Sequence, residues 1–534
     1  MATTWAAPAP HAAPKPAIRT GSPIAARIAA VLLALATLGL FARIMAYPLR
    51  HDEQMYLPVG ALLSDGALYQ DYGFNNLPNL PLLLHLVFTG SGTEHYLLTG
   101  RLVIFAGWLL AALAMALIVH RATGSGTAVV LAVLALFTSP PLLGPAGMTV
   151  TNNFLPIPFA LLGTHFFIAG LDRPHPHRAA LVISGLCLAV AAGFKANYIF
   201  LAPPFAIAAL LLPRHLPVAH RLTTVILPLT LGAIVGALPL LILAAPDPDA
   251  FIAHVLNYHR GPHMAYWQAN PSVDGPKIMS LGGKVQLAES IWFGGATLLI
   301  LLSCACLAFA GGLRRDAAKP LWPVLLVAAL TLGAALVSFV PTPAFPQYYV
   351  APIPFGIALT ALLYGRLDPH RRAAAAPFLQ AAAALMLLLG APRLLADLPQ
   401  LARPSHWAGN QAHAAGHDIA AAMNAVGPLA TLAPLYALEA GQKIYPELAA
   451  GPLVYRVGDL IPQHDRRYYR MVSPTTIGAL LAANPPAAIL IGYEGDLDTP
   501  LKAFAVAHGY RPVTFPSLHT RNGDGILYVR PPHG

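Results

Sequence analysis

Long apolar runs separated by short polar turns cover the first three quarters of the chain. Several of them reach the roughly 20 residues that an α-helix needs to cross the hydrocarbon core of a bilayer. A further apolar piece at 80–90, opened by Pro78 and Pro81, is too short to span. We expect it to form an amphipathic or re-entrant helix at the membrane interface. The pattern predicts eleven membrane-spanning helices, at residues 25–47, 98–119, 127–144, 150–170, 179–194, 197–212, 222–245, 286–311, 321–340, 347–365 and 374–392.

The pattern changes after about residue 395, where hydrophobicity falls. Short strand-like runs at 429–435, 487–492 and 525–529 alternate with helix-like runs at 411–426 and 474–483. Such alternation is typical of a compact α/β domain. We therefore expect an α-helical polytopic membrane protein, and its parts are a disordered cytoplasmic tail (1–23), a transmembrane domain (24–394) and a C-terminal extracytoplasmic α/β domain (395–534).

Composition agrees with this division. The 534 residues are 56% hydrophobic and only 10% charged, with a mean hydropathy of +0.60. A soluble domain usually carries about 25% charged residues. The net charge of +10 could indicate a nucleic-acid partner. The basic residues fall in the turns between apolar runs, however, so we interpret them as topology signals and expect no nucleic acid.

Basic residues occupy alternate loops of the predicted bundle. The loop at 51–81 belongs to the opposite set, which is poor in Lys and Arg for its length. The positive-inside rule then puts the N-terminus in the cytoplasm and the 51–81 loop outside, and an odd number of spans puts the C-terminal domain outside as well. The basic loops carry Arg121; Arg173 and Arg178; Arg214 and Arg221; Arg314, Arg315 and Lys319; Arg366, Arg371 and Arg372.

The loop at 51–81 holds the densest cluster of carboxylates and tyrosines in the chain. Asp52 and Glu53 directly follow the first predicted span, and Tyr56 lies one helical turn further on. Ionisable residues at a membrane face are costly, so they are functional candidates by default. The alternative is that both acids cap a juxtamembrane helix, where carboxylates are favourable near the N-terminus.

The order Asp52-Glu53, Tyr56, Gly66-x-x-Tyr69-x-Asp71 and a Pro-bounded apolar stretch resembles the first external loop of C-fold (GT-C) membrane glycosyltransferases. More narrowly it resembles family 39, which includes protein O-mannosyltransferases and the aminoarabinose transferase that modifies lipid A. The resemblance covers roughly residues 25–210, is patchier to about 390 and is weak beyond. It implies an enzyme that takes a sugar from a polyprenyl-phosphate carrier, with Asp52 as general base and Glu53 orienting it or sharing a metal with it.

The same resemblance implies residues that bind substrate or carrier. Tyr56, Tyr69 and Asp71 match positions of the family loop, although interfacial tyrosines also anchor proteins in membranes. Basic residues at the external face are expected to contact the carrier phosphate, and Gln347 and Tyr348 resemble a family segment near the carrier site, with an interfacial aromatic belt as the alternative. The basic candidates are Arg101, Lys195 and, in the aromatic stretch 251–270, Arg260.

One turn departs from the family pattern. Where many relatives have an Asp, this chain has Asn152 and Asn153, and an amide cannot act as a base or a strong metal ligand. His254, His259 and His263 have a spacing that zinc could use, but no Cys or carboxylate joins them. We therefore predict no metal site and no required cofactor, and leave a divalent metal open.

The sequence thus favours a multi-pass enzyme of the cell inner (plasma) membrane. Its expected partners are a polyprenyl-phosphate-linked sugar donor, the lipid bilayer and a glycan, lipid or protein acceptor. The alternatives are a transporter or lipid-carrier flippase, and a non-catalytic assembly protein. Transporters usually place their charges near the middle of the bilayer, whereas the charges here gather at one face, which favours the enzyme.

Overall fold

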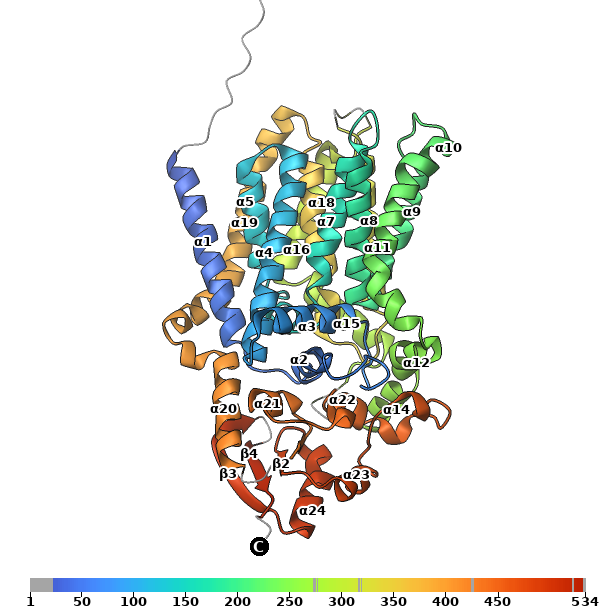
Figure 1. Cartoon of the computed structure of the whole chain (residues 1–534). Coiled ribbons are helices and arrows are strands. Elements are labelled where there is room, and N and C mark those ends of the chain that lie inside the picture. Colours follow the sequence, from blue (N-terminus) through green and yellow to red (C-terminus); the bar gives the residue numbers. More distant parts are fainter. Residues whose placement is uncertain are drawn as a thin grey trace, which may run out of the picture.

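The computed structural model describes residues 23–271, 275, 277–315, 317, 319–423, 427–520 and 523–531. The predicted tail lies outside the described residues, apart from Pro23. A bundle of steep helices forms the upper half of the molecule in Figure 1, and a smaller mixed domain lies against its lower end. The bundle consists of α1 (Pro23–Ala46), α4 (Tyr96–Thr123), α5 (Gly126–Phe137), α7 (Pro156–Leu171), α8 (Arg178–Phe194), α9 (Ala202–Leu211), α11 (Leu227–Ala244), α16 (Gly295–Leu307), α17 (Trp322–Ser338), α18 (Pro352–Tyr364) and α19 (Pro369–Asp397).

Each predicted span contains one of these helices. Within the described residues, five helical stretches are both long and apolar enough to cross a membrane, so the count of eleven stays a prediction. The expected single span at 286–311 is wrong, because the chain breaks between α15 (Leu281–Trp292) and α16 at Gly294 and Gly295. Gly295 has a φ of +52°, a backbone conformation that a continuous helix does not contain.

Close helix packing in the bundle depends on small residues. At Gly185 of α8, an added Cβ would lie 1.9 Å from the Leu229 carbonyl oxygen, and at Gly232 of α11 it would lie 1.9 Å from that of Val182. The two backbones therefore touch, as they do at small-residue interfaces of membrane helices. This pair holds α8, and hence the residue that follows it, in a fixed position.

Short elements join or flank the spans. They include helices with three- and five-residue hydrogen-bond spacing as well as α-helices. They are α6 (Pro145–Met148), η1 (Ala196–Leu201), α10 (Val218–Arg221), η2 (Leu222–Ile226), α12 (Pro248–Ile252), η3 (Ala253–Asn257), α13 (Tyr258–Arg260), α14 (Pro262–Ala269), η4 (Ala308–Gly312), η5 (Pro346–Tyr349), η6 (Leu398–Ala402) and η7 (Pro404–His406).

Two helices of the 51–95 segment lie across the lower end of the bundle. They are α2 (Glu53–Leu62) and α3 (Asn79–Ser91), and both run nearly perpendicular to the bundle in Figure 1. The α3 helix is the short apolar piece, and its orientation is that of a helix lying along a membrane surface. Buried residues cover most of α2, because the C-terminal domain packs against its other side.

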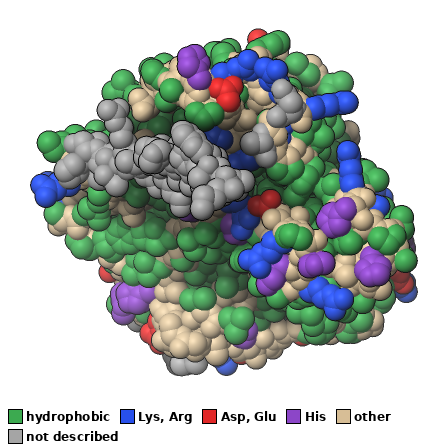
Figure 2. Space-filling model, turned by 90° about the horizontal axis from the view of Figure 1, so that it is seen from above, with side chains coloured by type: hydrophobic (Ala, Val, Ile, Leu, Met, Phe, Trp, Pro, Cys, Tyr) green, Lys and Arg blue, Asp and Glu red, His purple; other side chains and the backbone are tan. Residues whose placement is uncertain are grey.

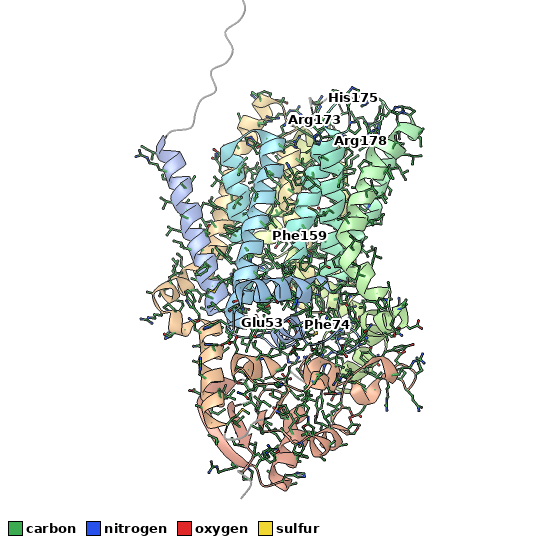
Figure 3. All side chains as sticks on the ribbon, in the orientation of Figure 1. Glu53, Phe74, Phe159, Arg173, His175 and Arg178 are labelled. Carbon is green, nitrogen blue, oxygen red and sulfur yellow. The ribbon has the colours of Figure 1, made fainter. Side chains whose placement is uncertain are left out.

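The two ends of the bundle differ in charge. Figure 3 shows Arg173, His175 and Arg178 at the upper end, and Glu53 and Phe74 at the lower end. Figure 2 looks onto the upper end and shows Lys, Arg and His side chains spread over it. The acidic loop and these basic turns therefore lie at opposite ends of the bundle. Which end faces the cytoplasm stays a prediction.

The C-terminal domain is built on a four-stranded mixed sheet with the order β1-β2-β4-β3. β1 pairs parallel with β2 (Leu429 opposite Ala488), while β4 is antiparallel to both β2 and β3. Its elements are α20 (Ala408–Ala422), β1 (Leu429–Thr431), α21 (Pro434–Glu439), η8 (Pro446–Leu448), α22 (Pro452–Tyr455), η9 (Gly458–Leu460), η10 (Arg466–Tyr468), α23 (Ile477–Ala483), β2 (Ala488–Ile491), η11 (Gly495–Asp498), α24 (Thr499–Ala507), β3 (Arg511–Thr520) and β4 (Gly523–Val529).

The predicted strands and helices of this domain are present with different bounds. β1, β2 and α23 are shorter than predicted, β4 begins two residues earlier, and α20 begins at Ala408 and ends at Ala422. The strand β3 was not predicted, because its sequence RPVTFPSLHT contains two prolines. Proline lacks the N–H that a central strand must donate, but an edge strand tolerates it, and β3 is at the edge of the sheet.

The C-terminal domain is joined to the membrane domain by hydrogen bonds at the acidic loop. The Leu435 N–H donates to the Gln54 side chain at 3.0 Å, and the Leu97 N–H donates to Glu439 at 3.0 Å. Tyr258 donates to the Leu453 carbonyl at 2.6 Å. These bonds fix the position of α21 and α22 over α2 and over the 251–270 segment.

Candidate active site

Glu53 and Arg101 form a buried ion pair at the start of α2. Arg101 Nε and Nη2 each donate to one carboxylate oxygen at 2.7 Å, and neither side chain has any exposed surface. The backbone N–H groups of Val150 and Arg50 also donate to the Glu53 carboxylate, at 2.8 and 2.9 Å. Arg101 also donates to the carbonyl of Ile44, so the pair ties the end of α1 to α2, α4 and the turn before α7.

Asp52 stands beside this pair but has a different environment. It occupies the N-cap position of α2 with helical backbone angles, and its side chain makes no capping hydrogen bond. Asp52 therefore makes no capping hydrogen bond, but it stands at the N-terminus of α2, where a carboxylate is favourable, so the alternative stays open. Its side chain is half-buried, whereas Glu53 is fully buried. Arg101 thus binds the carboxylate of Glu53, whereas the carboxylate of Asp52 accepts no hydrogen bond among the described residues.

The negative charge of Asp52 shifts the pKa of three side chains. Burial raises the pKa of Tyr56 well above its ordinary value, and Asp52 raises it further. Burial and then Asp52 likewise raise the pKa of Tyr348. Burial lowers the pKa of Lys195 to about 7, and Asp52 opposes that shift. Asp52, Tyr56, Lys195 and Tyr348 therefore form one cluster, which we call the Asp52 cluster.

Lys195 is placed in this cluster by the end of α8. Its Nζ donates to the Asn153 side-chain oxygen at 2.5 Å and lies 4.5 Å from the centre of the Tyr348 ring. Asn153 stands in the turn where the sequence departs from the family pattern. The amide supplies an acceptor that orients the ammonium group without neutralising it, as a carboxylate there would. Lys195 thus keeps its charge available for an anion.

The hydroxyl of Tyr56 also lies beside this turn. The backbone N–H of Asn152 lies close enough to the hydroxyl to oppose the rise in its pKa, and the Tyr56 ring packs edge-on against Phe74 at a centroid distance of 5.9 Å. The turn at 149–153 therefore adjoins both Tyr56 and Lys195. Sequence reasoning treated its two amides only as a departure from the pattern.

The other predicted site residues lie outside the Asp52 cluster. Tyr69 is buried with a φ of +69° and donates to the Asn76 carbonyl at 2.6 Å, so it shapes the loop. Asp71 accepts the Ala67 N–H at 2.8 Å and is about half exposed. Arg260 is exposed and has no described hydrogen bond or ion pair. The substrate or carrier roles of these three residues stay predictions.

Gln347 precedes Tyr348 but lines a separate space. This cavity of about 430 Å³ lies between α15, α16 and α19, and Thr297 and Arg393 contribute to its wall. Gln347 therefore adjoins the Asp52 cluster in the chain and also lines this cavity. Its carrier-binding role stays a prediction.

The three histidines of the 251–270 segment do not converge on one point. His254 Nδ1 contacts the Ala250 carbonyl at 2.8 Å, and His259 Nε2 contacts that of Asn75 at 2.8 Å. Among the described residues, no group of three or more His, Cys, Asp or Glu side chains is arranged to hold a metal ion. The zinc alternative for these histidines therefore has no support in their geometry.

The C-terminal domain brings one residue to this region that sequence reasoning missed. Arg456, directly after α22, acts electrostatically on Tyr348 and stacks over the rings of Tyr266 and Trp267. Nothing in the surrounding sequence LVYRV distinguishes it from other arginines. The only usable signal was that a cation stands in an otherwise apolar run.

Solved structures with a similar fold are membrane glycosyltransferases. No protein-family profile and no curated protein matches the chain. ArnT from Cupriavidus metallidurans bound to undecaprenyl phosphate superposes with a TM-score of 0.62 at 14% identity, over 95% of this chain and 100% of that one. Its apo state gives a TM-score of 0.63 at 14% identity, over 96% and 100%.

A third structure, an oligosaccharyltransferase from Archaeoglobus fulgidus in complex with Zn and sulfate, gives a TM-score of 0.51 at 13% identity, over 91% of this chain and 71% of that one. The similarity to ArnT extends through the C-terminal domain, where the sequence resemblance is weak. At these identities the comparison establishes the fold. The chain therefore has the C-type (GT-C) fold of membrane glycosyltransferases, the type whose first external loop its residues 51–81 resemble.

Proposed function

We propose that this chain is an inner-membrane glycosyltransferase that moves one sugar from a polyprenyl-phosphate donor to an acceptor hydroxyl outside the cytoplasm. The observation that carries the proposal is the Asp52 cluster, in which the Asp52 carboxylate, without a hydrogen bond among the described residues, and the half-buried Lys195 ammonium group lie within electrostatic range of each other at one end of the bundle. Undecaprenyl phosphate is bound by ArnT, whose fold this chain shares. A lipid-linked donor of that class would bring a phosphate, an anion that the Lys195 ammonium group can bind.

In the proposed reaction Asp52 accepts the proton of the acceptor hydroxyl. The hydroxyl oxygen attacks the anomeric carbon as the bond from that carbon to the phosphate oxygen breaks. The bonding electrons leave with the phosphate, and Lys195 stabilises the negative charge that develops on it. The phosphate is already a good leaving group, so a single base suffices, and one displacement inverts the anomeric configuration. General-base catalysis of this kind typically contributes about 10²–10⁴-fold to the rate.

Glu53 has a positioning role in this scheme. Both of its oxygens are engaged by Arg101 and by backbone N–H groups, so the carboxylate is unsuited to accept a proton from substrate. By anchoring the first turn of α2, the pair sets the direction in which Asp52 projects. Arg101 then has a structural role, and other basic residues bind the carrier phosphate.

The test uses the purified full chain in lipid nanodiscs with undecaprenyl-phosphate sugars labelled in the sugar. The wild type should release labelled sugar from at least one donor to water or to an added lipid or peptide acceptor. Asp52→Asn should lower that rate by about 10²–10⁴-fold while binding undecaprenyl phosphate normally. Asp65→Asn is the matched control, since Asp65 is an exposed acid of the same loop.

Two results would contradict the proposal at different levels. Normal turnover by Asp52→Asn would show that another group is the base. A wild-type chain that neither binds undecaprenyl phosphate nor turns over any donor of the panel would remove the glycosyltransferase proposal itself. Movement of undecaprenyl phosphate between leaflets without sugar release would support the flippase alternative instead.

A further inference from the structure

Arg456 is a buried cation of the C-terminal domain with no anionic partner. Its residue is 9% exposed, and its Nε has no hydrogen-bond partner among the described residues. No carboxylate of the described part of the chain lies within ion-pair distance of it. The guanidinium lies 4.8 Å from the Trp267 ring centre and 5.2 Å from that of Tyr266.

Such an arrangement needs a counter-charge. Arginine stays ionised in proteins, and burying an ionised group without a partner is strongly unfavourable. The other two buried arginines of the described chain have acceptors. Arg101 pairs with Glu53, and Arg366 donates to three backbone carbonyls, those of Gly312, Arg314 and Lys319. Arg456 has neither a carboxylate nor a carbonyl acceptor among the described residues. Aromatic rings hold the Arg456 side chain in place but do not neutralise it. A bound anion is the remaining source of charge.

The position of Arg456 shows where that anion would bind. Tyr348 feels the charge of Arg456, and the Tyr348 ring also lies under the Lys195 ammonium at 4.5 Å. The Trp267 ring, on which Arg456 stacks, lies 6.3 Å from the His263 ring, and the His263 ring lies 5.6 Å from that of His259. Lys195 acts electrostatically on His259 from the other side. Two cations, one from each domain, therefore flank the same aromatic patch.

We propose that Arg456 and Lys195 together form a two-cation site for a phosphate ester, closed between the C-terminal domain and the membrane domain. A guanidinium fork and an ammonium group suit the several oxygens of a phosphate monoester. The inference rests on the proposed function and assigns the C-terminal domain a part in binding the substrate. The ester belongs either to the lipid carrier or to a phosphorylated acceptor.

The test is binding of undecaprenyl phosphate to the full chain in nanodiscs, with undecaprenol as the ligand that lacks the phosphate. Arg456→Gln should lower the affinity for undecaprenyl phosphate at least about tenfold and leave the affinity for undecaprenol unchanged. Arg456→Lys should keep part of the affinity for undecaprenyl phosphate. Arg467→Gln is the matched control, because Arg467 also stacks on a tyrosine ring, at 4.7 Å, but is exposed.

A second measurement separates binding from folding. Without ligand, Arg456→Gln should unfold at a temperature no lower than the wild type, because the native cation has no anion to lose. With undecaprenyl phosphate, the wild type should gain thermal stability and the variant should gain much less. If Arg456→Gln loses stabilisation by diphosphoryl lipid A but not by undecaprenyl phosphate, Arg456 still belongs to a phosphate site, and that site binds the acceptor.

Other outcomes overturn the inference. These are wild-type affinity of Arg456→Gln for both phosphate ligands, or an equal loss of undecaprenol binding, which would indicate a structural role. Failure of the proposed function looks different, since the wild type would then bind undecaprenyl phosphate through Arg456 and still transfer no sugar. Binding and turnover therefore report on the two proposals separately.

Discussion

The buried pair of Glu53 and Arg101 offers a sharp test of how the site is held together. Arg101→Gln leaves a carboxylate with no exposed surface and only two N–H donors, from Val150 and Arg50. Removing one partner of a buried ion pair typically costs about 3–5 kcal/mol, mostly because the other charge is left uncompensated. We expect a loss of that size in the free energy of unfolding.

The double variant identifies the origin of that loss. Glu53→Gln combined with Arg101→Gln leaves no buried charge, so it should be more stable than the sum of the single changes implies, by on the order of 1–3 kcal/mol. Asp397→Asn is the matched control. Asp397 contacts Arg43 at the same 2.7 Å but is 26% exposed, and a partly exposed pair contributes about 1 kcal/mol or less.

The assay is reversible unfolding of the purified protein in mixed micelles titrated with dodecyl sulfate, followed by tryptophan fluorescence. Trp108 is a built-in reporter, since it is fully buried and donates to the Gly147 carbonyl, one residue from a carbonyl that accepts from Arg101. Strictly additive single and double variants, or an Arg101→Gln variant no less stable than Asp397→Asn, would refute the reasoning.

Two further predictions concern Lys195 and its neighbours. Because burial lowers the pKa of Lys195 to about 7, the wild type should lose affinity for undecaprenyl phosphate as the pH rises through that value, whereas Lys195→Arg should bind with little change from about pH 6 to about pH 9. A flat wild-type profile would contradict this. In Gly193→Ala the new Cβ would lie 2.2 Å from the Asn79 side-chain nitrogen, so the Asn79 amide must move and lose its hydrogen bond to the Val190 carbonyl, and we expect a loss of about 1–3 kcal/mol in the same titration. Gly90→Ala, whose Cβ meets nothing within 4 Å, should unfold like the wild type, and equal behaviour of the two variants would count against the packing argument.

Much of the bundle could be predicted from hydrophobic runs alone, because a spanning helix must satisfy every backbone group internally and so needs a long apolar segment. The prediction failed where one apolar run contains a backbone break, as at Gly294 and Gly295, since hydrophobicity carries no record of φ. The edge strand β3 was missed because its two prolines argue against a strand, although an edge strand tolerates them.

Only part of the site could be predicted from the sequence. The resemblance pointed to Asp52 and Lys195, which the structure brings within electrostatic range of each other. It could not separate the roles of Asp52 and Glu53, because the difference arises from an arginine 48 positions away in the chain. Arg456 could not be found at all, since it becomes notable only when its burial and its lack of a carboxylate partner are known.

The division of the phosphate site between two domains has a consequence for how the chain is made. A ribosome completes the Glu53–Arg101 pair early, but it reaches Arg456 only near the end of translation. At about 5–20 residues per second the gap is on the order of half a minute. During that time the nascent chain sits in the membrane with Asp52 and Lys195 already made and only one of the two cations present. If the proposed two-cation site binds the carrier phosphate, an unfinished or prematurely terminated chain would bind it more weakly than a complete copy.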